Sequence, residues 1–269
     1  MDEKIKNKTE LSFSFLGAIG YFLLFLLIVV LMSNLGYLIL KIFLNELSHD
    51  LYLSSIFGIA LSVSVFLYLV LADLKLLVKI IGKKLFTPKI YLTTVLVTFG
   101  FYILNVEIIK LVQLFVPIND MLLEFSIRIY ENNLLTAVIL VAIIPGIFEE
   151  LLFRGFFLTG LKRKYNSRIA IIISSLLFAV MHFNPHQIVM AFIAGLLLGW
   201  IYDQTSSLLL VVIIHTLNNL LAVFSIHYYG VTDIILTEVE FIPLWKLLLV
   251  LLFTGLGIYY LTKLSIIDN

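Results

Sequence analysis

Long runs of apolar residues alternate with short polar segments along this chain. About 20 apolar residues in a helix are enough to cross a hydrocarbon core of ~30 Å, and runs of this length recur. The pattern predicts an all-α fold, a polytopic membrane protein that is a bundle of about eight transmembrane helices. The predicted spans are 13–40, 52–72, 90–117, 133–160, 168–182, 187–203, 206–225 and 242–263.

The succession of the spans predicts a single structural domain. No internal repeat, low-complexity tract or linker divides the chain, and very short polar turns join the fifth, sixth and seventh spans. Three parts can be distinguished within it. Residues 1–132 contain the first three helices, residues 133–225 contain helices four to seven, and residues 226–269 contain an outer loop and the last helix.

Composition indicates that lipid surrounds most of the chain. Of the 269 residues, 62% are hydrophobic and 13% are charged, and the mean hydropathy is +1.12. A soluble domain of this length could not bury so much apolar surface. We therefore expect a lipid bilayer around the helices and, since the basic residues lie in short loops, no nucleic-acid partner. The absence of cysteine excludes disulfides, thiolate metal ligands and a cysteine nucleophile.

The basic residues predict that both termini lie in the cytosol, because Lys and Arg concentrate on that side of a membrane. With a cytosolic N-terminus, only Lys41, Arg128 and Lys246 fall on the opposite side. The thirteen on the cytosolic side are Lys4, Lys6, Lys8, Lys75, Lys79, Lys83, Lys84, Lys89, Lys162, Arg163, Lys164, Arg168 and Lys263. The first apolar run is longer than the about 7–15 residues of a signal-peptide core, so we expect an uncleaved span. The sequence thus predicts a multi-pass protein of the plasma membrane.

Ionisable residues inside spans are costly, and they mark a function or a pairing partner. In the fourth predicted span, Glu150 and Arg154 are four residues apart on a helix and can form an ion pair. Glu149 lies about 100° around the helix and has no partner in its sequence neighbourhood. A charge triad that holds helices together is the structural alternative. A carboxyl group without a partner in lipid can exchange protons near neutral pH, which favours a functional site.

Two further spans carry polar residues at a similar depth. His182 lies near the end of the fifth span, while His215 and Asn219 share one face of the seventh. At 1.5 Å per residue, Glu149 and His182 lie roughly 20 Å from the cytosolic ends of their spans, and His215 roughly 14 Å. Each residue alone could be an interhelical polar contact. Independent contacts have no reason to coincide in depth, so we expect one buried site formed by three helices.

Other polar residues are expected to lie outside this site. Glu107 and Lys110 are spaced i,i+3 in the third span and should form a structural pair. His186 and His227 are expected in loops on the far side, without a role in the site.

Three ordered elements resemble a known family. Glu-Glu-x-x-x-Arg at 149–154, Phe-x-x-x-His at 178–182 and His-x-x-x-Asn at 215–219 are similar to CAAX-type prenyl proteases and their bacterial relatives. The bacterial set is called the CPBP or Abi family and includes bacteriocin-processing and immunity proteins. The resemblance covers roughly residues 133–225, which would form the catalytic core, and no core position departs from the pattern.

The resemblance implies an intramembrane endopeptidase acting on a membrane-bound peptide or protein. It implies that Glu149 and His182 activate a water molecule, and that His215 and Asn219 stabilise the tetrahedral oxyanion. Glu150 and the arginine four residues later would orient Glu149 or its helix. The alternative is a non-catalytic membrane scaffold or bacteriocin self-immunity protein that retains the same residues. A transporter is disfavoured because the inverted repeats expected of one are absent.

Two versions of the chemistry stay open. In the first, no cofactor is used, and Glu149 and His182 act directly on water. In the second, a metalloprotease version, Glu149, His182 and His215 bind Zn²⁺, which acidifies its water, and Asn219 is the main oxyanion donor. The His-Glu-x-x-His spacing of zincins does not occur, which favours the metal-free version.

Overall fold

The computed structural model describes residues 12–43, 86–116, 133–230 and 240–267, and residues 64 and 127 individually. These segments are helical and contain no strand. The elements are α2 (Phe15–Phe43), α5 (Pro88–Gln113), α7 (Leu134–Ala137), η1 (Val138–Ile143), α8 (Ile144–Glu150), η2 (Leu151–Leu158), α9 (Thr159–Leu161), α10 (Ser167–Val180), α11 (Pro185–Thr205), α12 (Leu208–Tyr229) and α14 (Leu244–Ile267).

The predicted all-α membrane fold is confirmed. Six helical segments of the described residues are long and apolar enough to cross a membrane. Apart from residue 64, the predicted span 52–72 lies outside the described residues. The predicted span 168–182 corresponds to α10, a helix of 14 residues. At 1.5 Å per residue, α10 is about 21 Å long and therefore shorter than a hydrocarbon core of ~30 Å. The count of eight spans is thus approximate, while the multi-pass architecture holds.

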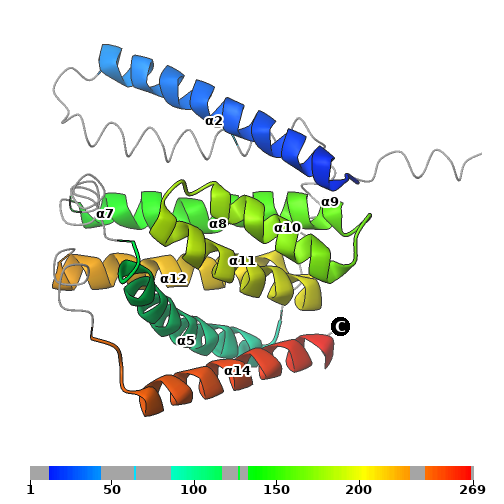
Figure 1. The fold of residues 1–269 in the computed structure, drawn as a ribbon, viewed down its shortest axis with the longest axis vertical. Helices are drawn as coiled ribbons and strands as arrows, with labels where there is room; N and C mark the ends of the chain where they lie inside the picture. The colour runs from blue at the N-terminus through cyan, green and yellow to red at the C-terminus, as the bar shows by residue number, and fades with distance from the viewer. Residues whose placement is uncertain are drawn as a thin grey trace, which may run out of the picture.

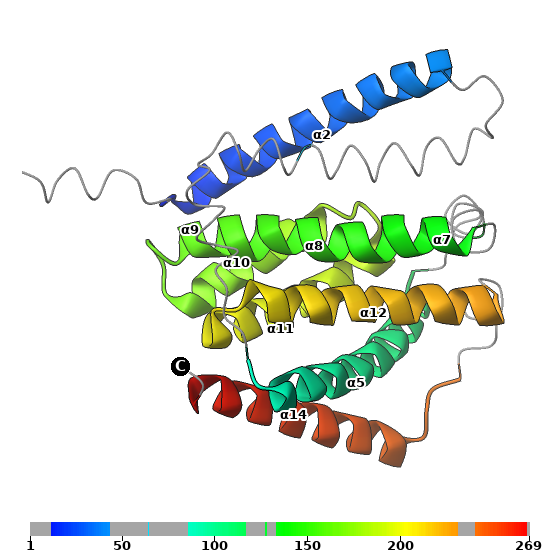
Figure 2. The ribbon, with the colours of Figure 1, turned by 180° about the vertical axis from the view of Figure 1, so that it is seen from behind.

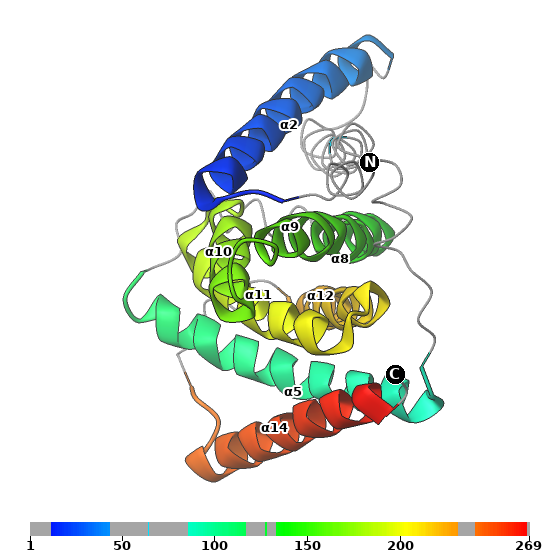
Figure 3. The ribbon, with the colours of Figure 1, turned by 90° about the vertical axis from the view of Figure 1, so that its right-hand side faces the viewer.

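The segment from α7 to α9 runs through the middle of the molecule (Figures 1 and 2). It packs against α12 through η1 and α8, and against α10 through η2. Helix α11 packs on α10, while α5 packs against α12 and α14. Figure 3 shows α2 at one side of the molecule and α14 at the other, with these helices between them. Glu149 and Glu150 of α8 and His215 of α12 are buried in this bundle, and His182 follows the end of α10.

The central segment is not a regular α-helix, because η1 and η2 are π-helical. Pro145, at the start of α8, has no N–H and cannot donate to the carbonyl of Val141 four residues earlier. In η1 the Ile144 N–H instead bonds to the carbonyl of Ile139, five residues back. Such wide turns are rare and occur often at functional sites. Here they flank the seven residues of α8, which include both glutamates.

Gly146 allows α8 and α12 to cross closely. A Cβ atom at this position would lie 2.1 Å from Thr216 Oγ1 and 2.9 Å from the Thr216 Cα atom. The backbone of α12 cannot give way as a flexible side chain would. Close packing at this crossing keeps the glutamates of α8 next to His215 of α12.

Gly146→Ala should therefore destabilise the protein. We expect a loss of about 1–3 kcal/mol, as is typical of overpacked sites, and a lower Tm in detergent. Gly255→Ala is the matched control, because a Cβ at Gly255 meets nothing within 4 Å. Equal Tm values for the two variants would contradict the close crossing.

Candidate active site

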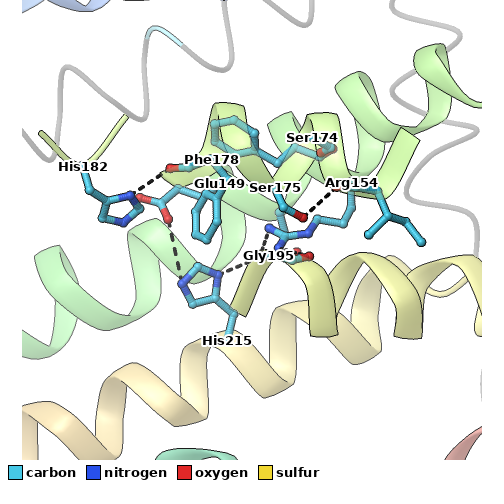
Figure 4. A network of polar contacts seen from close by, with 11 residues as sticks. Glu149, Arg154, Ser174, Ser175, Phe178, His182, Gly195 and His215 are labelled. Carbon is cyan, nitrogen blue, oxygen red and sulfur yellow. Dashed lines mark hydrogen bonds and ion pairs between the residues drawn. The ribbon is translucent and has the colours of Figure 1, made fainter. Parts of the chain in front are cut away.

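A buried ion pair forms the base of the site. Arg154 Nη1 donates to Glu150 Oε1 at 2.7 Å, as the sequence predicts. The second guanidinium nitrogen, Nη2, donates to the carbonyl of Gly195 at 3.3 Å. Both charged side chains are almost fully buried. The pair thereby links the central segment to α11 (Figure 4).

The same carboxylate oxygen also holds His215. His215 Nδ1 lies 2.7 Å from Glu150 Oε1. A carboxylate that already accepts from Arg154 is an acceptor, so Nδ1 carries the proton and donates. The other ring nitrogen, Nε2, faces Glu149 Oε2 at 3.8 Å. Glu150 thus contacts His215 directly, in addition to Arg154, the partner that the sequence predicts for it.

His182 is fixed in the corresponding way. Its Nδ1 lies 2.9 Å from the carbonyl of Phe178, one turn earlier in α10. A carbonyl oxygen only accepts, so His182 Nδ1 carries a proton and donates it to this bond. Figure 4 shows the Glu149 carboxylate between the rings of His182 and His215. Two imidazoles and one buried carboxyl therefore converge, as the comparison of depths predicts.

Phe178 is the apolar surface shared by these groups. Its ring lies edge-to-face with His182 at 5.0 Å and with His215 at 5.8 Å between centroids. The Arg154 guanidinium carbon lies 4.8 Å from the centroid of the same ring. Phe178 is buried. Sequence reasoning noted Phe178 only for its spacing from His182 and gave it no contact with the other two residues.

Asn219 lies one helical turn from His215 and contacts a different element. Its Nδ2 donates to the carbonyl of Val141 in η1 at 3.1 Å. Asn218 Nδ2 donates to Asn219 Oδ1 at 3.5 Å, and Asn105 Nδ2 of α5 donates to Asn218 Oδ1 at 3.1 Å. Sequence reasoning missed Asn105. The only available signal was a polar residue in an apolar span.

Glu107, Lys110, Ser174 and Ser175 have structural partners. The predicted pair of Glu107 and Lys110 is confirmed at 2.6 Å, and Glu107 also accepts from the backbone N–H of Ile242 at 3.1 Å. The hydroxyls of Ser174 and Ser175 donate to main-chain carbonyls of Phe153 and Ile171, at 2.8 and 2.7 Å.

The loop assignment of two histidines was wrong. His186 lies in the first turn of α11, where it is buried and its Nε2 donates to the carbonyl of Val116 at 2.7 Å. His227 lies in the last turn of α12. The apolar pattern underestimated the length of both helices, because their terminal turns contain polar and aromatic residues.

A zinc site requires several donor atoms that converge on one metal ion. Both Nε2 atoms and the Glu149 carboxylate are chemically suitable donors, and ring N–H groups held by a carboxylate or carbonyl are common around metals. Within the described segments, however, no group of three or more His, Asp and Glu side chains is placed to hold a metal ion. Glu149, His182 and His215 therefore do not form a zinc site in their present positions.

The central part of the chain is similar to a known protein family. Residues 131–221 match the family model described as Rce1-like, type II CAAX prenyl endopeptidase Rce1-like. The match includes all of the clustered side chains and Asn219, and it confirms the resemblance to CAAX-type proteases. No curated protein and no solved structure matches the chain.

Arg154→Met should be strongly destabilising. It leaves the Glu150 carboxylate buried without its cation, and breaking such a pair typically costs about 3–5 kcal/mol. The double variant Glu150→Gln with Arg154→Met removes both charges and should recover part of the loss. The Tm of the purified variants in detergent measures both effects. A double variant less stable than Arg154→Met would show that the charges do not depend on each other.

Proposed function

We propose that this protein is an intramembrane endopeptidase that hydrolyses a peptide bond in a membrane-associated peptide or protein. The observation that carries the proposal is the placement of Glu149 between His182 and His215 inside the bundle. The match of residues 131–221 to a family of peptidases supports the reaction class. The main alternative, a membrane scaffold or self-immunity protein without catalysis, predicts that Glu149 can be replaced without loss of function.

Glu149 and His182 are assigned the activation of water. A water molecule between the Glu149 carboxylate and His182 Nε2 gives up a proton to this pair while its oxygen attacks the peptide carbonyl carbon. The new C–O bond leaves a tetrahedral intermediate with negative charge on the former carbonyl oxygen. When the intermediate collapses, the C–N bond breaks, and the proton passes to the leaving amine. Both protein groups are held before substrate binds, which lowers the entropic barrier.

His215 and Asn219 are assigned the stabilisation of the oxyanion. Asn219 uses one amide N–H for the Val141 carbonyl and keeps a second one to donate. His215 is held by Glu150 through Nδ1 and presents Nε2 beside Glu149, and it donates to the oxyanion from Nε2 when that nitrogen carries a proton. Preorganised donors of this kind are worth about 10²–10³ in rate each.

Glu149→Gln should abolish cleavage while leaving the fold intact. The probe is an internally quenched peptide with a C-terminal CAAX sequence, offered farnesylated and unmodified to protein in liposomes. We expect the rate to fall by about 10²–10⁴, as for loss of a general base. Glu107→Gln is the control, because this buried carboxyl pairs with Lys110 away from the cluster. Accumulation of precursors in Glu149→Gln membranes would identify natural substrates.

Two outcomes of this assay would contradict the proposal. If Glu149→Gln cleaves like the wild type, or fully replaces it in cells, the scaffold reading is favoured. Loss of wild-type activity in 1,10-phenanthroline, restored by Zn²⁺, would contradict the metal-free mechanism but keep the peptidase. We expect activity to survive chelation.

We also propose that the protein lies in the plasma membrane with both termini in the cytosol. The chain has no cysteine, so single cysteines report on topology without background. Lys164→Cys lies in the turn after α9, and Tyr228→Cys lies near the end of α12, at the opposite end of the bundle (Figure 2). A membrane-impermeant maleimide should label Tyr228→Cys in intact cells and Lys164→Cys only after lysis. The reverse pattern would invert the orientation.

A further inference from the structure

A line of three asparagine side chains connects α5 to the central segment. It runs from Asn105 in α5 through Asn218 and Asn219 in α12 to the carbonyl of Val141 in η1. Helix α5 lies outside residues 131–221, the stretch that matches the peptidase family. Asn105 is nevertheless buried, with 4% of its surface exposed, and its partner is 113 residues away in the sequence.

The main-chain carbonyl sets the direction of all three hydrogen bonds. The oxygen of Val141 can only accept, so Asn219 must present its NH₂ group there and its Oδ1 toward Asn218. Asn218 then donates to Asn219 and turns its own Oδ1 toward Asn105. Each carboxamide therefore has one orientation in which the line is complete.

Pro145 follows Val141 by four residues and has no N–H, so the α-helical hydrogen bond to the Val141 carbonyl is missing. The Asn219 amide donates to this oxygen. Since Val141 and Glu149 lie on the same continuous segment, about two turns apart, the line ends on the backbone that carries the proposed base.

Asn105 has little structural justification of its own. Its Oδ1 is buried and accepts no hydrogen bond from the described residues. An unsatisfied buried acceptor is destabilising, and a leucine would avoid that cost. Among the described residues, Asn218 is the one hydrogen-bond partner of the Asn105 side chain. Asn105 is costly for stability and is connected to the candidate site by hydrogen bonds. A role in that site best explains why an asparagine stands at this position.

We infer that Asn105 is a positioning residue that holds the carboxamide of Asn219 through Asn218, so that its second N–H is kept in place for the oxyanion. The inference rests on the proposed peptidase function. Without Asn105, the Asn218 amide loses its orientation, and Asn219 Oδ1 loses a fixed donor. The 3.5 Å contact between Asn218 and Asn219 is the longest of the three, so the coupling is partial.

The test is Asn105→Leu, measured with the quenched CAAX peptide in liposomes. Leucine has nearly the same volume and removes the donor. We expect kcat to fall by about ten- to a hundredfold with KM unchanged, because an oxyanion donor acts in the transition state. Thr98→Val is the matched control on α5, since the buried Thr98 hydroxyl donates only to the Thr94 carbonyl of its own helix. The control should keep the wild-type kcat.

A double-mutant cycle separates positioning from a general effect on the fold. If Asn105 acts through Asn219, the variant Asn105→Leu with Asn219→Ala should be no slower than Asn219→Ala alone. Asn218→Leu should reproduce the loss of Asn105→Leu, and it replaces that variant if Asn105→Leu does not fold. The Tm of each variant, measured beside the kinetics, should stay near that of the wild type.

Three results would overturn the inference. These are an unchanged kcat in Asn105→Leu, an effect that multiplies with that of Asn219→Ala, or an equal loss in Thr98→Val. In each of them, the wild type still cleaves and Glu149→Gln does not, so the peptidase function stands. A wild type that cleaves no peptide would instead remove the proposed function, and the role of Asn105 with it.

Discussion

One carboxylate oxygen organises the interior of this protein. Glu150 Oε1 accepts from Arg154 and from His215, each at 2.7 Å. Burying these charges in lipid is costly, and the cost is offset only while all the partners stay in place. The arrangement therefore ties α12 and α11 to the central segment in one register. Glu149, the preceding residue, is left as the carboxyl that faces both imidazoles, while Oε1 of Glu150 is engaged by Arg154 and His215.

Apolar surfaces keep this polar cluster in place. The Phe178 ring contacts both histidines and the guanidinium of Arg154. Gly146 allows α12 to approach α8 closely, and Gly195 allows α10 to approach α11. A Cβ atom at either glycine would clash with the opposing helix. In lipid no hydrophobic force drives helices together, so close packing and interhelical hydrogen bonds have to do so. The same two interactions that assemble the bundle also position the side chains assigned to catalysis.

The sequence predicted the parts of the site that depend on span length and helical spacing. The rise per residue of a helix gives the depth of each residue in its span. Similar depths therefore predicted that Glu149, His182 and His215 lie together. It could not reveal that Asn105 reaches Asn218, because the pairing of distant helices depends on packing rather than on local pattern. The sequence also did not predict the π-helical turns. The spacing of apolar residues does not show which carbonyl accepts from each backbone N–H.

Main-chain oxygens hold three of the polar side chains in this region. The carbonyls of Val141, Phe178 and Gly195 accept from Asn219, His182 and Arg154 respectively. A side-chain substitution does not remove a main-chain carbonyl. These three hydrogen-bond acceptors therefore remain in any variant that preserves the local backbone. A mutational scan would accordingly score Val141 as an ordinary lipid-compatible position and overlook its contribution. In this protein, part of the architecture of the candidate site is encoded in the path of the helix rather than in residue identity.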